Sequence, residues 1–310
     1  MITTPETLTV LESVDPDLRA SLEAFPGFDI TAEFLPIIRQ FPAKPPRQTP
    51  SYREVFIAPV DEERPLRCLI VDPIPDAQNR PVLVYYHGGG FIFGSPEITL
   101  PTAQKLAEDV GCLIVLLEYR LAPEHPYPAA LEDGLRVLFW LDANADRLRL
   151  DTSRIAIGGD SAGGGHAVVL TGAAYERSPI NPSNLFLVYP MLDNETGADG
   201  TGGTRIWTAK NNRFGWASYM GSAAAVDVTV PATIKTLQNF PPTFLATGTL
   251  DLFFDENIRF VEDLQSKGVS VEHHVFEGAY HAFDVMVPEA KISKNFHVAC
   301  VNGLKKHLIA

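Results

Sequence analysis

The stretch that decides the fold is Gly158-Gly159-Asp160-Ser161-Ala162-Gly163, which contains Gly-x-Ser-x-Gly centred on Ser161. It follows Arg154-Ile155-Ala156-Ile157, a short run typical of a buried strand, and precedes the small, apolar run 162–175, which indicates a helix. A nucleophilic serine at the edge of a parallel sheet requires this order of strand, sharp turn and helix. The glycines two residues before and after the serine prevent a clash in the turn. Ser161 is therefore predicted to lie at a helix N-terminus, where backbone N–H groups favour negative charge.

A second motif, His87-Gly88-Gly89-Gly90, follows the apolar run Val82-Leu83-Val84-Tyr85-Tyr86. Glycines after a strand let backbone N–H groups approach a substrate oxygen, because no Cβ atom stands in the way. Either motif alone could be an ordinary glycine-rich turn. Both motifs in this order favour an acyl-transfer site.

The chain has 310 residues, ordinary globular composition and a formal net charge of −13. This acidic balance argues against nucleic acid or an anionic membrane as the main partner. Residues 1–20 carry acids and no apolar core, so we expect neither a signal peptide nor stable membrane insertion. Cys68, Cys112 and Cys300 lie far apart in apolar runs, which indicates buried thiols without a metal or redox role. Cysteine use of this kind predicts a cytoplasmic protein.

From residue 52 onward, strand patterns alternate with helix patterns, which predicts an α/β fold with a mostly parallel sheet and helices on both faces. The first two strands, 54–57 and 66–71, are expected to be antiparallel at a sheet edge. The other expected strands are 82–86, 112–118, 154–157, 185–189, 243–247 and 271–276. The expected helices are 99–110, 129–143, 161–175, 255–267 and about 291–308. Residues 1–50 have helical patterns, including 31–41, interrupted by prolines, and residues 195–240 break the alternation.

A serine nucleophile needs a base, and the base needs an orienting acid. Asp251 ends a strand at the edge where the motifs meet. We favour it over Asp255, which opens a helix and suits an N-cap role. Among the downstream histidines, only His281 lies in a loop just past a strand end, and we favour it as the base. The histidines at 273, 274, 297 and 307 lie within a strand or the last helix, and His87 is more suited to shaping the glycine loop.

Several other polar residues are expected to have structural roles. Asp160 should support the serine turn, His125 should belong to a fixed turn, and His166 should be packed. Arg120 and Glu124 should form ion pairs.

These residues together resemble the bacterial hormone-sensitive-lipase-like (family IV) esterases of the α/β-hydrolase superfamily. The resemblance covers roughly residues 50–310. It rests on the following segments: His87–Gly90, Tyr119-Arg120-Leu121-Ala122-Pro123-Glu124, Gly159–Gly164, Asp251-x-x-x-Asp255-Glu256 and Glu277-Gly278-x-x-His281-x-Phe283.

The resemblance implies an α/β-hydrolase core at 51–310 with an eight-stranded sheet, an N-terminal helical cap at 1–50 and a second cap segment at 195–230. It also implies Ser161 as nucleophile, Asp251 as orienting acid and His281 as base. The backbone N–H groups of Gly88, Gly89 and Ala162 would form the oxyanion hole.

The sequence departs from the family at two positions. Asp251 is followed by Leu-Phe-Phe where the family usually has a proline close by, and His281 is followed by Ala282 where the family often has glycine. Neither change removes a chemical group. We expect them to shift the histidine loop and so affect rate or substrate preference.

We therefore expect a carboxylic-ester hydrolase that forms an acyl-enzyme from short- to medium-chain acyl esters, with no cofactor and no metal. The expected partner is a small-molecule ester, and a homodimer is plausible. The alternatives are an amidase or deacetylase on the same triad, a non-catalytic small-molecule receptor, and an inactive interaction module. The aromatic side chains of the second cap segment, Trp207, Phe214, Trp216 and Tyr219, either line a substrate pocket or hold the cap on the core.

Overall fold

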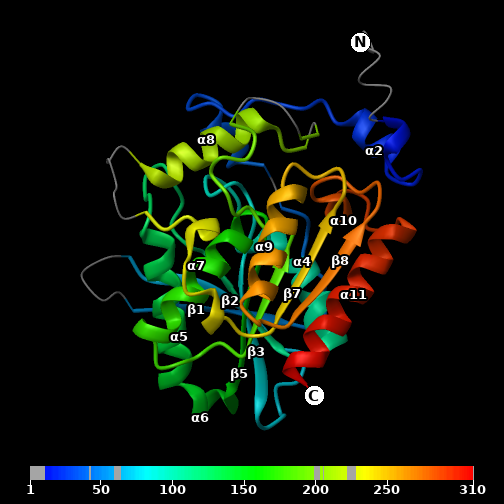
Figure 1. The fold of residues 1–310 in the computed structure, drawn as a ribbon. Helices are drawn as coiled ribbons and strands as arrows, with labels where there is room; N and C mark the ends of the chain where they lie inside the picture. Colours follow the sequence, from blue (N-terminus) through cyan, green and yellow to red (C-terminus); the bar gives the residue numbers. More distant parts are fainter. Residues whose placement is uncertain are drawn as a thin grey trace.

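The computed structural model describes residues 11–41, 43–58, 64–198, 203–204, 206–221 and 228–309 (Figure 1). Eight strands form one sheet. They are β1 (Tyr52–Ile57), β2 (Leu66–Val71), β3 (Arg80–Tyr86), β4 (Leu113–Leu117), β5 (Leu150–Asp160), β6 (Asn184–Val188), β7 (Thr243–Gly248) and β8 (Val271–Phe276). Their order across the sheet is β1-β2-β4-β3-β5-β6-β7-β8.

Helices alternate with these strands, as the sequence predicts. The longer helices are α4 (Pro96–Val110), α5 (Ala129–Ala143), α7 (Ala162–Arg177), α8 (Ala209–Met220), α9 (Phe254–Ser266) and α11 (Lys291–Leu308). The short helices are α2 (Arg19–Ala24), α3 (Leu35–Ile38), α6 (Ala145–Leu148), α10 (Phe283–Met286) and the 3₁₀ turns η1 (Pro231–Thr233) and η2 (Leu237–Asn239).

The sheet is mostly parallel. β2 runs antiparallel to both of its neighbours, β1 and β4, and all the pairs from β4 to β8 are parallel. The predicted antiparallel pair at the edge is therefore confirmed, as is the predicted α/β-hydrolase architecture. Because the parallel strands end at one edge, the loops that follow them meet there.

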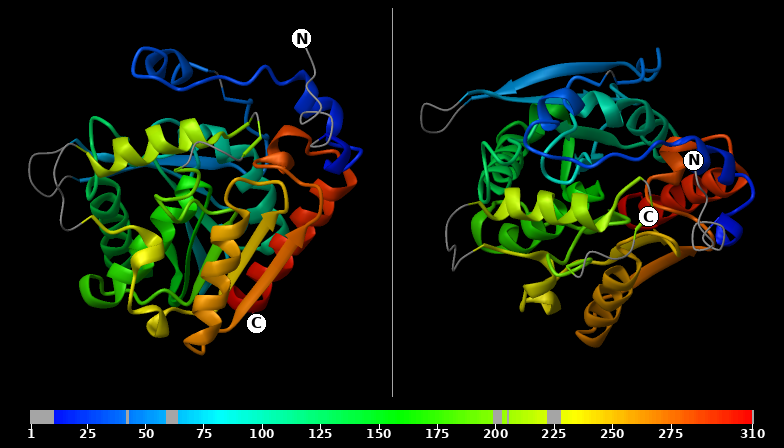
Figure 2. Two further views of the ribbon diagram at one scale, coloured as in Figure 1. Left: turned by 45° about the horizontal axis from the view of Figure 1, so that its top comes forward. Right: turned by 90° about the horizontal axis from the view of Figure 1, so that it is seen from above.

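Both faces of the sheet are covered (Figures 1 and 2). On one face, apolar side chains of α5, α7 and α9 pack against the sheet in a single buried cluster. On the other face, α4 and α11 contact each other and cover a second buried cluster. Inner strands such as β3 and β4 are buried along their whole length, which explains their continuous apolar sequences.

A third layer lies above the carboxyl ends of the strands and includes residues 11–41 and α8 (Figure 2). Its contacts join distant parts of the chain. The Asn211 side chain accepts a hydrogen bond from the Ile30 N–H and donates one to the Phe28 carbonyl, at 2.8 and 3.0 Å. The Arg39 guanidinium donates to the carbonyl oxygens of Ile92 and Ala122. We call this the upper layer.

One predicted helix is much shorter than expected. The pattern at 31–41 predicts a helix, but only Leu35–Ile38 is helical, with Pro36 in its first turn. Leu35 and Ile38 still face a buried cluster that includes Phe91 and Trp216. Burial against the core, rather than helix length, therefore accounts for the apolar pattern. No helix among the described residues is long and apolar enough to span a membrane.

Candidate active site

Ser161 occupies a strained turn between β5 and α7. Its backbone has φ 54° and ψ −122°, a conformation that non-glycine residues rarely adopt. A Cβ atom on Gly159 would lie 2.4 Å from the Gly163 carbonyl, and one on Gly163 would lie 2.2 Å from the Tyr86 carbonyl oxygen. The two flanking glycines are therefore required by backbone atoms, as predicted.

The structure brings the three predicted side chains into one hydrogen-bonded row. His281 Nε2 lies 3.0 Å from Ser161 Oγ, and His281 Nδ1 lies 2.7 Å from Asp251 Oδ2. All three residues are buried. The second oxygen of Asp251 accepts the Phe253 N–H at 2.9 Å, which fixes the carboxylate. Because Nδ1 faces a carboxylate, it carries the hydrogen, and Nε2 is then free to accept one from the serine.

Two aromatic rings hold the imidazole of His281 from its sides. Tyr189 and Phe253 meet it edge to face, with ring centroids 4.8 and 5.2 Å away. The Tyr189 hydroxyl in turn donates to Asp284 Oδ1 at 2.9 Å. Sequence reasoning did not identify these neighbours, because they come from the ends of other strands and helices.

The alternative candidates for the acid and the base do not join this hydrogen-bonded row. Asp255 is exposed in the first turn of α9, and Phe253 occupies the N-cap position, so the predicted N-cap role of Asp255 is wrong. The physical reason is that Asp251 itself binds the Phe253 N–H before the helix begins. His274 pairs with Glu272 and His297 pairs with Asp109, both away from Ser161.

The structure of the glycine loop after β3 differs from the prediction at one oxyanion donor. The Gly88 N–H donates to the Asp160 carboxyl, and a Cβ atom on Gly88 would lie 2.3 Å from Asp160 Oδ2. Within the described part of the chain, the N–H groups of Gly89, Gly90 and Ala162 have no backbone acceptor. Gly90 thus has a free N–H that sequence reasoning missed, whereas the N–H of Gly88 is already used.

His87 shapes this loop, as predicted. Its Nδ1 donates to the neighbouring Gly88 carbonyl at 2.8 Å, and its ring stacks on Tyr119 with centroids 4.3 Å apart. The Tyr119 hydroxyl donates to the His87 carbonyl at 2.8 Å. Burial lowers the pKa of His87 to about 4, so the ring is neutral near pH 7.

The carboxyl of Asp160 supports the serine turn from the other side. Burial raises its pKa to about 6, and the nearby Asp284 carboxylate adds to the rise. Hydrogen bonds from Tyr85 and from the Gly88 N–H oppose that rise, because they favour the ionised form. The same carboxyl therefore connects the serine turn to the glycine loop.

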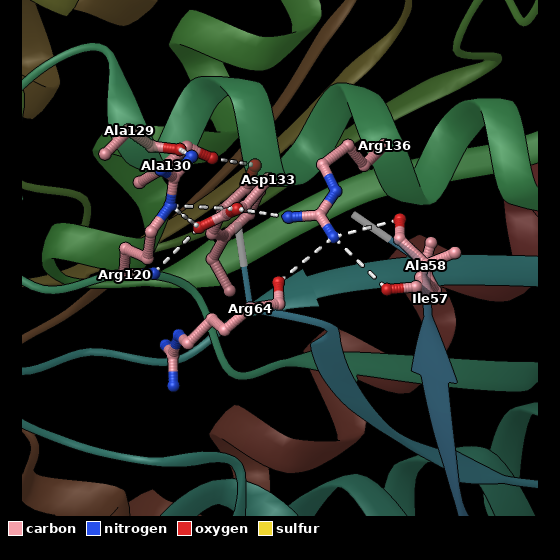
Figure 3. Close-up of polar contacts among 9 residues, drawn as sticks. Ile57, Ala58, Arg64, Arg120, Ala129, Ala130, Asp133 and Arg136 are labelled. Atoms are coloured by element: carbon pink, nitrogen blue, oxygen red, sulfur yellow. Dashed lines mark hydrogen bonds and ion pairs between the residues drawn. The ribbon is translucent and has the colours of Figure 1, made fainter. Parts of the chain in front are cut away.

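The segment Tyr119–Glu124 is held by ion pairs, as predicted for Arg120 and Glu124. Arg120 Nε lies 3.1 Å from Asp133 Oδ2, and Asp133 also pairs with Arg136 at 3.4 Å (Figure 3). Arg136 then donates to carbonyl oxygens around the β1–β2 connection. Glu124 pairs with Arg39 at 2.7 Å, which ties the segment to the upper layer.

Aromatic side chains in and just before α8 pack against the glycine loop and the Phe91 ring that follows it. Trp216 and Tyr219 contact the Phe91 ring at centroid distances of 4.9 and 4.5 Å. A Cβ atom on Gly90 would lie 2.2 Å from the Trp207 ring. Trp207, Trp216 and Tyr219 are each at most 5% exposed, so these three side chains hold the upper layer on the core.

The fold and the Ser161 turn define an α/β hydrolase, and comparison with known proteins agrees. Residues 83–285 match the family model described as an alpha/beta hydrolase fold. Esterase LipI of Mycobacterium tuberculosis is 31% identical over 284 residues, which cover 87% of this chain and 88% of that protein. Carboxylesterase NlhH of the same organism is 32% identical over 296 residues, covering 89% and 92%.

Solved structures give the same result. A bacterial heroin esterase superposes with a TM-score of 0.87 at 30% identity, covering 96% of this chain and 99% of that one. Esterase LipW from Mycobacterium marinum has a TM-score of 0.85 at 30% identity, covering 97% and 98%. The chain belongs to the α/β-hydrolase family, among its esterases and carboxylesterases, and the resemblance drawn from the motifs is confirmed.

Proposed function

We propose that the protein is a serine carboxylesterase in which Ser161, His281 and Asp251 form the catalytic triad. The observation that carries this proposal is the position of His281, within hydrogen-bond distance of Ser161 Oγ through one ring nitrogen and of Asp251 through the other. A base that is itself oriented by an acid is what a serine hydroxyl needs to become a nucleophile. The esterase relatives support the same reading.

The reaction follows from this row of groups. As Ser161 Oγ attacks the ester carbonyl carbon, its proton moves to His281 Nε2, and Asp251 stabilises the imidazolium that results. The proton then passes to the leaving alcohol oxygen when the carbon–oxygen bond breaks. A water molecule enters, gives its proton to His281 and attacks the acyl carbon. The acid leaves, and the proton returns to Ser161.

The free N–H groups near Ser161 are proposed as the oxyanion hole. Gly89 and Ala162 remain from the sequence prediction, and Gly90 replaces Gly88, whose N–H is held by Asp160. Each such donor contributes about 3 kcal/mol to transition-state stabilisation in a related acyl-transfer enzyme. The Ala162 N–H also lies at the first residue of α7, where the helix dipole favours a developing negative charge.

The substrate class, the cap and the assembly of the protein are proposed from its sequence pattern. We propose a small-molecule ester of short to medium acyl chain as substrate, with residues 1–50 and 195–230 acting as the cap. A homodimer, a cytoplasmic location and independence from metals and cofactors stay predictions. The base role of His281 counts against a receptor that only binds its ligand.

The test is hydrolysis of p-nitrophenyl esters from acetate to palmitate by the wild type and by Ser161→Ala. We expect turnover that is highest on short chains and falls by about 10⁵ or more in kcat in the variant, because the nucleophile is lost. Ser51→Ala, an exposed serine on the linker before β1, is the matched control and should keep full activity. A folded wild type that hydrolyses none of these esters would refute the proposal.

A further inference from the structure

A cavity of about 580 Å³ lies on the face of the sheet that α4 and α11 cover. None of the described residues that line it belongs to the triad or to the glycine loop 87–90, so the cavity is separate from the proposed active site. A space of this volume is within the range of small-molecule sites. The proposed reaction leaves it without a role.

Apolar side chains form much of the cavity wall. They are Ile98, Pro101 and Leu106 of α4, Phe296 and Val298 of α11, and Phe186 and Val188 of β6. Phe186 and Val188 are buried, whereas Ile98 and Val298 are exposed, so the apolar wall extends from solvent to the sheet. An occupant with an apolar body is favoured, because contact with this wall removes apolar surface from water.

The first turn of α11 forms another part of the wall and lacks the groups that usually cap a helix. Its N-cap residue, Ala290, makes no side-chain hydrogen bond, and the turn holds no acidic residue. Among the described residues, Asp17 accepts the Lys291 N–H at 3.3 Å, but nothing accepts the N–H of Ser293. Because the N-terminus of an 18-residue helix carries partial positive charge, this end of the cavity favours an anion.

The Ser293 side chain gives a second, independent sign of a ligand. It lines the cavity, is 3% exposed, and its hydroxyl has no hydrogen-bond partner among the described residues. A buried hydroxyl left unpaired costs free energy, which a ligand recovers when it supplies an acceptor. An ionised carboxylate is an acceptor with two oxygens, so it suits both the hydroxyl and the N–H of this residue.

Basic side chains surround the mouth of the cavity. The exposed basic residues of the lining are Lys44, Arg47, Lys105 and Lys294. The last three form ion pairs with carboxylates. Lys44 has no carboxylate partner in the described part of the chain, and its ammonium donates to the Val285 carbonyl at 3.1 Å, a few residues before α11. It therefore supplies a positive charge that no ion pair neutralises.

The carboxyls of the lining determine which way an anion would enter. The Glu289 side chain is 86% exposed at the mouth, where Lys294 pairs with it. Asp160 and Asp284 lie at the inner end, where they accept hydrogen bonds from Tyr85 and Tyr189, and burial raises the pKa of both. Any charge on these two carboxyls repels an anion, so they direct a ligand's carboxylate to the mouth and leave the inner end to its apolar chain.

We propose that this cavity is an accessory binding site for a carboxylate with an apolar chain. The hydroxyl and N–H of Ser293 hold the carboxylate at the N-terminus of α11, Lys44 is its counter-ion, and the chain lies between α4 and α11. The inference goes beyond the proposed esterase function and does not rest on it, because neither the triad nor the glycine loop takes part in binding.

The first experiment compares molecules that differ only in their polar end. Octanoate, 1-octanol and octyltrimethylammonium are titrated by calorimetry into the wild type. We expect octanoate to bind at least about tenfold more tightly than the other two, because only octanoate brings an anion to α11 and Lys44. If 1-octanol or the ammonium compound bound as tightly as octanoate, the inference would be overturned.

Two variants then test whether octanoate occupies this cavity. Lys44→Glu reverses the charge at the mouth. Ser293→Asp places a carboxylate at the helix N-terminus, where it favours the helix but takes the position of the ligand's carboxylate. We expect each variant to weaken octanoate binding at least about tenfold. Because Lys44 is exposed, Lys44→Glu keeps the test decisive even if Ser293→Asp does not fold.

The matched control is Lys235→Glu, which makes the same change of charge at an exposed lysine outside the cavity wall. It should bind octanoate as the wild type does. Neither Lys44→Glu nor Ser293→Asp should change the hydrolysis of p-nitrophenyl acetate, since both residues lie apart from the triad. An octanoate isotherm that is the same in the wild type and in both cavity variants would place the acid elsewhere and refute the accessory site.

Discussion

The strand ends and the upper layer differ in what holds their residues in place. At the strand ends, Ser161, Asp251 and His281 each lie on a turn or loop that follows a strand, and backbone hydrogen bonds between neighbouring strand ends hold these segments, such as the one from the Ser161 N–H to the Val188 carbonyl. In the upper layer, the described helices other than α8 have six residues or fewer, and side chains such as Asn211 and Arg39 join segments far apart in sequence. The strand ends are therefore held by many backbone contacts within the sheet, whereas the upper layer depends on a few side chains.

The largest expected effect comes from breaking the local geometry at Gly163. In Gly163→Ala the new methyl group would lie 2.2 Å from the Tyr86 carbonyl and 2.6 Å from that of His87, so backbone must move. We expect a loss of stability of about 3 kcal/mol and a fall in esterase activity of at least a hundredfold. Urea unfolding and p-nitrophenyl acetate hydrolysis measure the two effects.

The control for that change lies in the same helix. A Cβ atom on Gly172 has no neighbour closer than 3.6 Å, so Gly172→Ala should fold normally and gain up to about 1 kcal/mol from helix propensity. If Gly163→Ala were as stable and active as Gly172→Ala, the turn would not be specified by backbone contacts.

The second largest effect concerns the charge beneath the serine turn. The pKa of Asp160 is raised from 3.8 to about 6, so the folded state holds this proton more tightly than the unfolded state. The contribution of this group to stability is therefore full below pH 4 and is lost as the pH rises through 6. Asp160→Asn should be more stable than the wild type at pH 8, by up to about 3 kcal/mol, and equal to it at pH 4.

Thermal melts from pH 4 to pH 8 test this pH dependence. Asp133→Asn is the contrasting variant, because the Asp133 carboxylate pairs with Arg120 and Arg136, and its loss should destabilise the protein at pH 8. A wild type that is more stable than Asp160→Asn at pH 8 would contradict the burial argument.

The third prediction breaks the upper layer without touching the strand ends. Asn211→Ala leaves the Ile30 N–H and the Phe28 carbonyl without their side-chain partner, at a cost of about 2 kcal/mol that should fall mainly on residues 11–41. We expect faster proteolysis and faster amide exchange in that segment and a raised KM. Lys210→Ala, which removes only an exposed ion pair to Asp29, should change these rates little. If Asn211→Ala changed amide exchange equally in the sheet and in residues 11–41, the two regions would not be held independently.

The smallest effect sharpens the description of the histidine loop. Ala282 has φ 59°, a left-handed conformation that favours glycine. This explains why the esterases that the sequence resembles often have glycine at this position. Ala282→Gly should stabilise the folded protein by no more than about 1 kcal/mol, because glycine also gains freedom in the unfolded chain. Chemical denaturation of the wild type and Ala282→Gly measures this difference in the free energy of unfolding. A loss of more than 1 kcal/mol would mean that the Ala282 methyl group contributes packing that outweighs the strain.

The contrast between the two regions also explains what the sequence could predict. The strand-then-turn pattern and the order serine, acid, histidine identify Ser161, Asp251 and His281, because each depends on neighbours within a few residues. The choice among Gly88, Gly89 and Gly90 could not be made from sequence, since it depends on the Asp160 carboxyl at the end of another strand.

Two further features depend on contacts that no local pattern reports. The helix expected at 31–41 shortens to Leu35–Ile38, because its apolar residues follow the surface beneath them rather than a helix axis. The cavity between α4 and α11 is likewise lined by residues from 44 to 300, so it forms only when the whole sheet is assembled.

The Arg39 guanidinium couples the upper layer mechanically to the glycine loop. It donates hydrogen bonds to the Ile92 carbonyl, the Ala122 carbonyl and the Glu124 carboxylate, and Ile92 lies two residues after Gly90, one of the proposed oxyanion donors. Any movement of residues 11–41 away from the core must break these hydrogen bonds or move the neighbouring oxyanion donors as well. One side chain therefore holds both the N-terminal segment and the chain next to the proposed oxyanion donors, so the loss of the Arg39 guanidinium would loosen both.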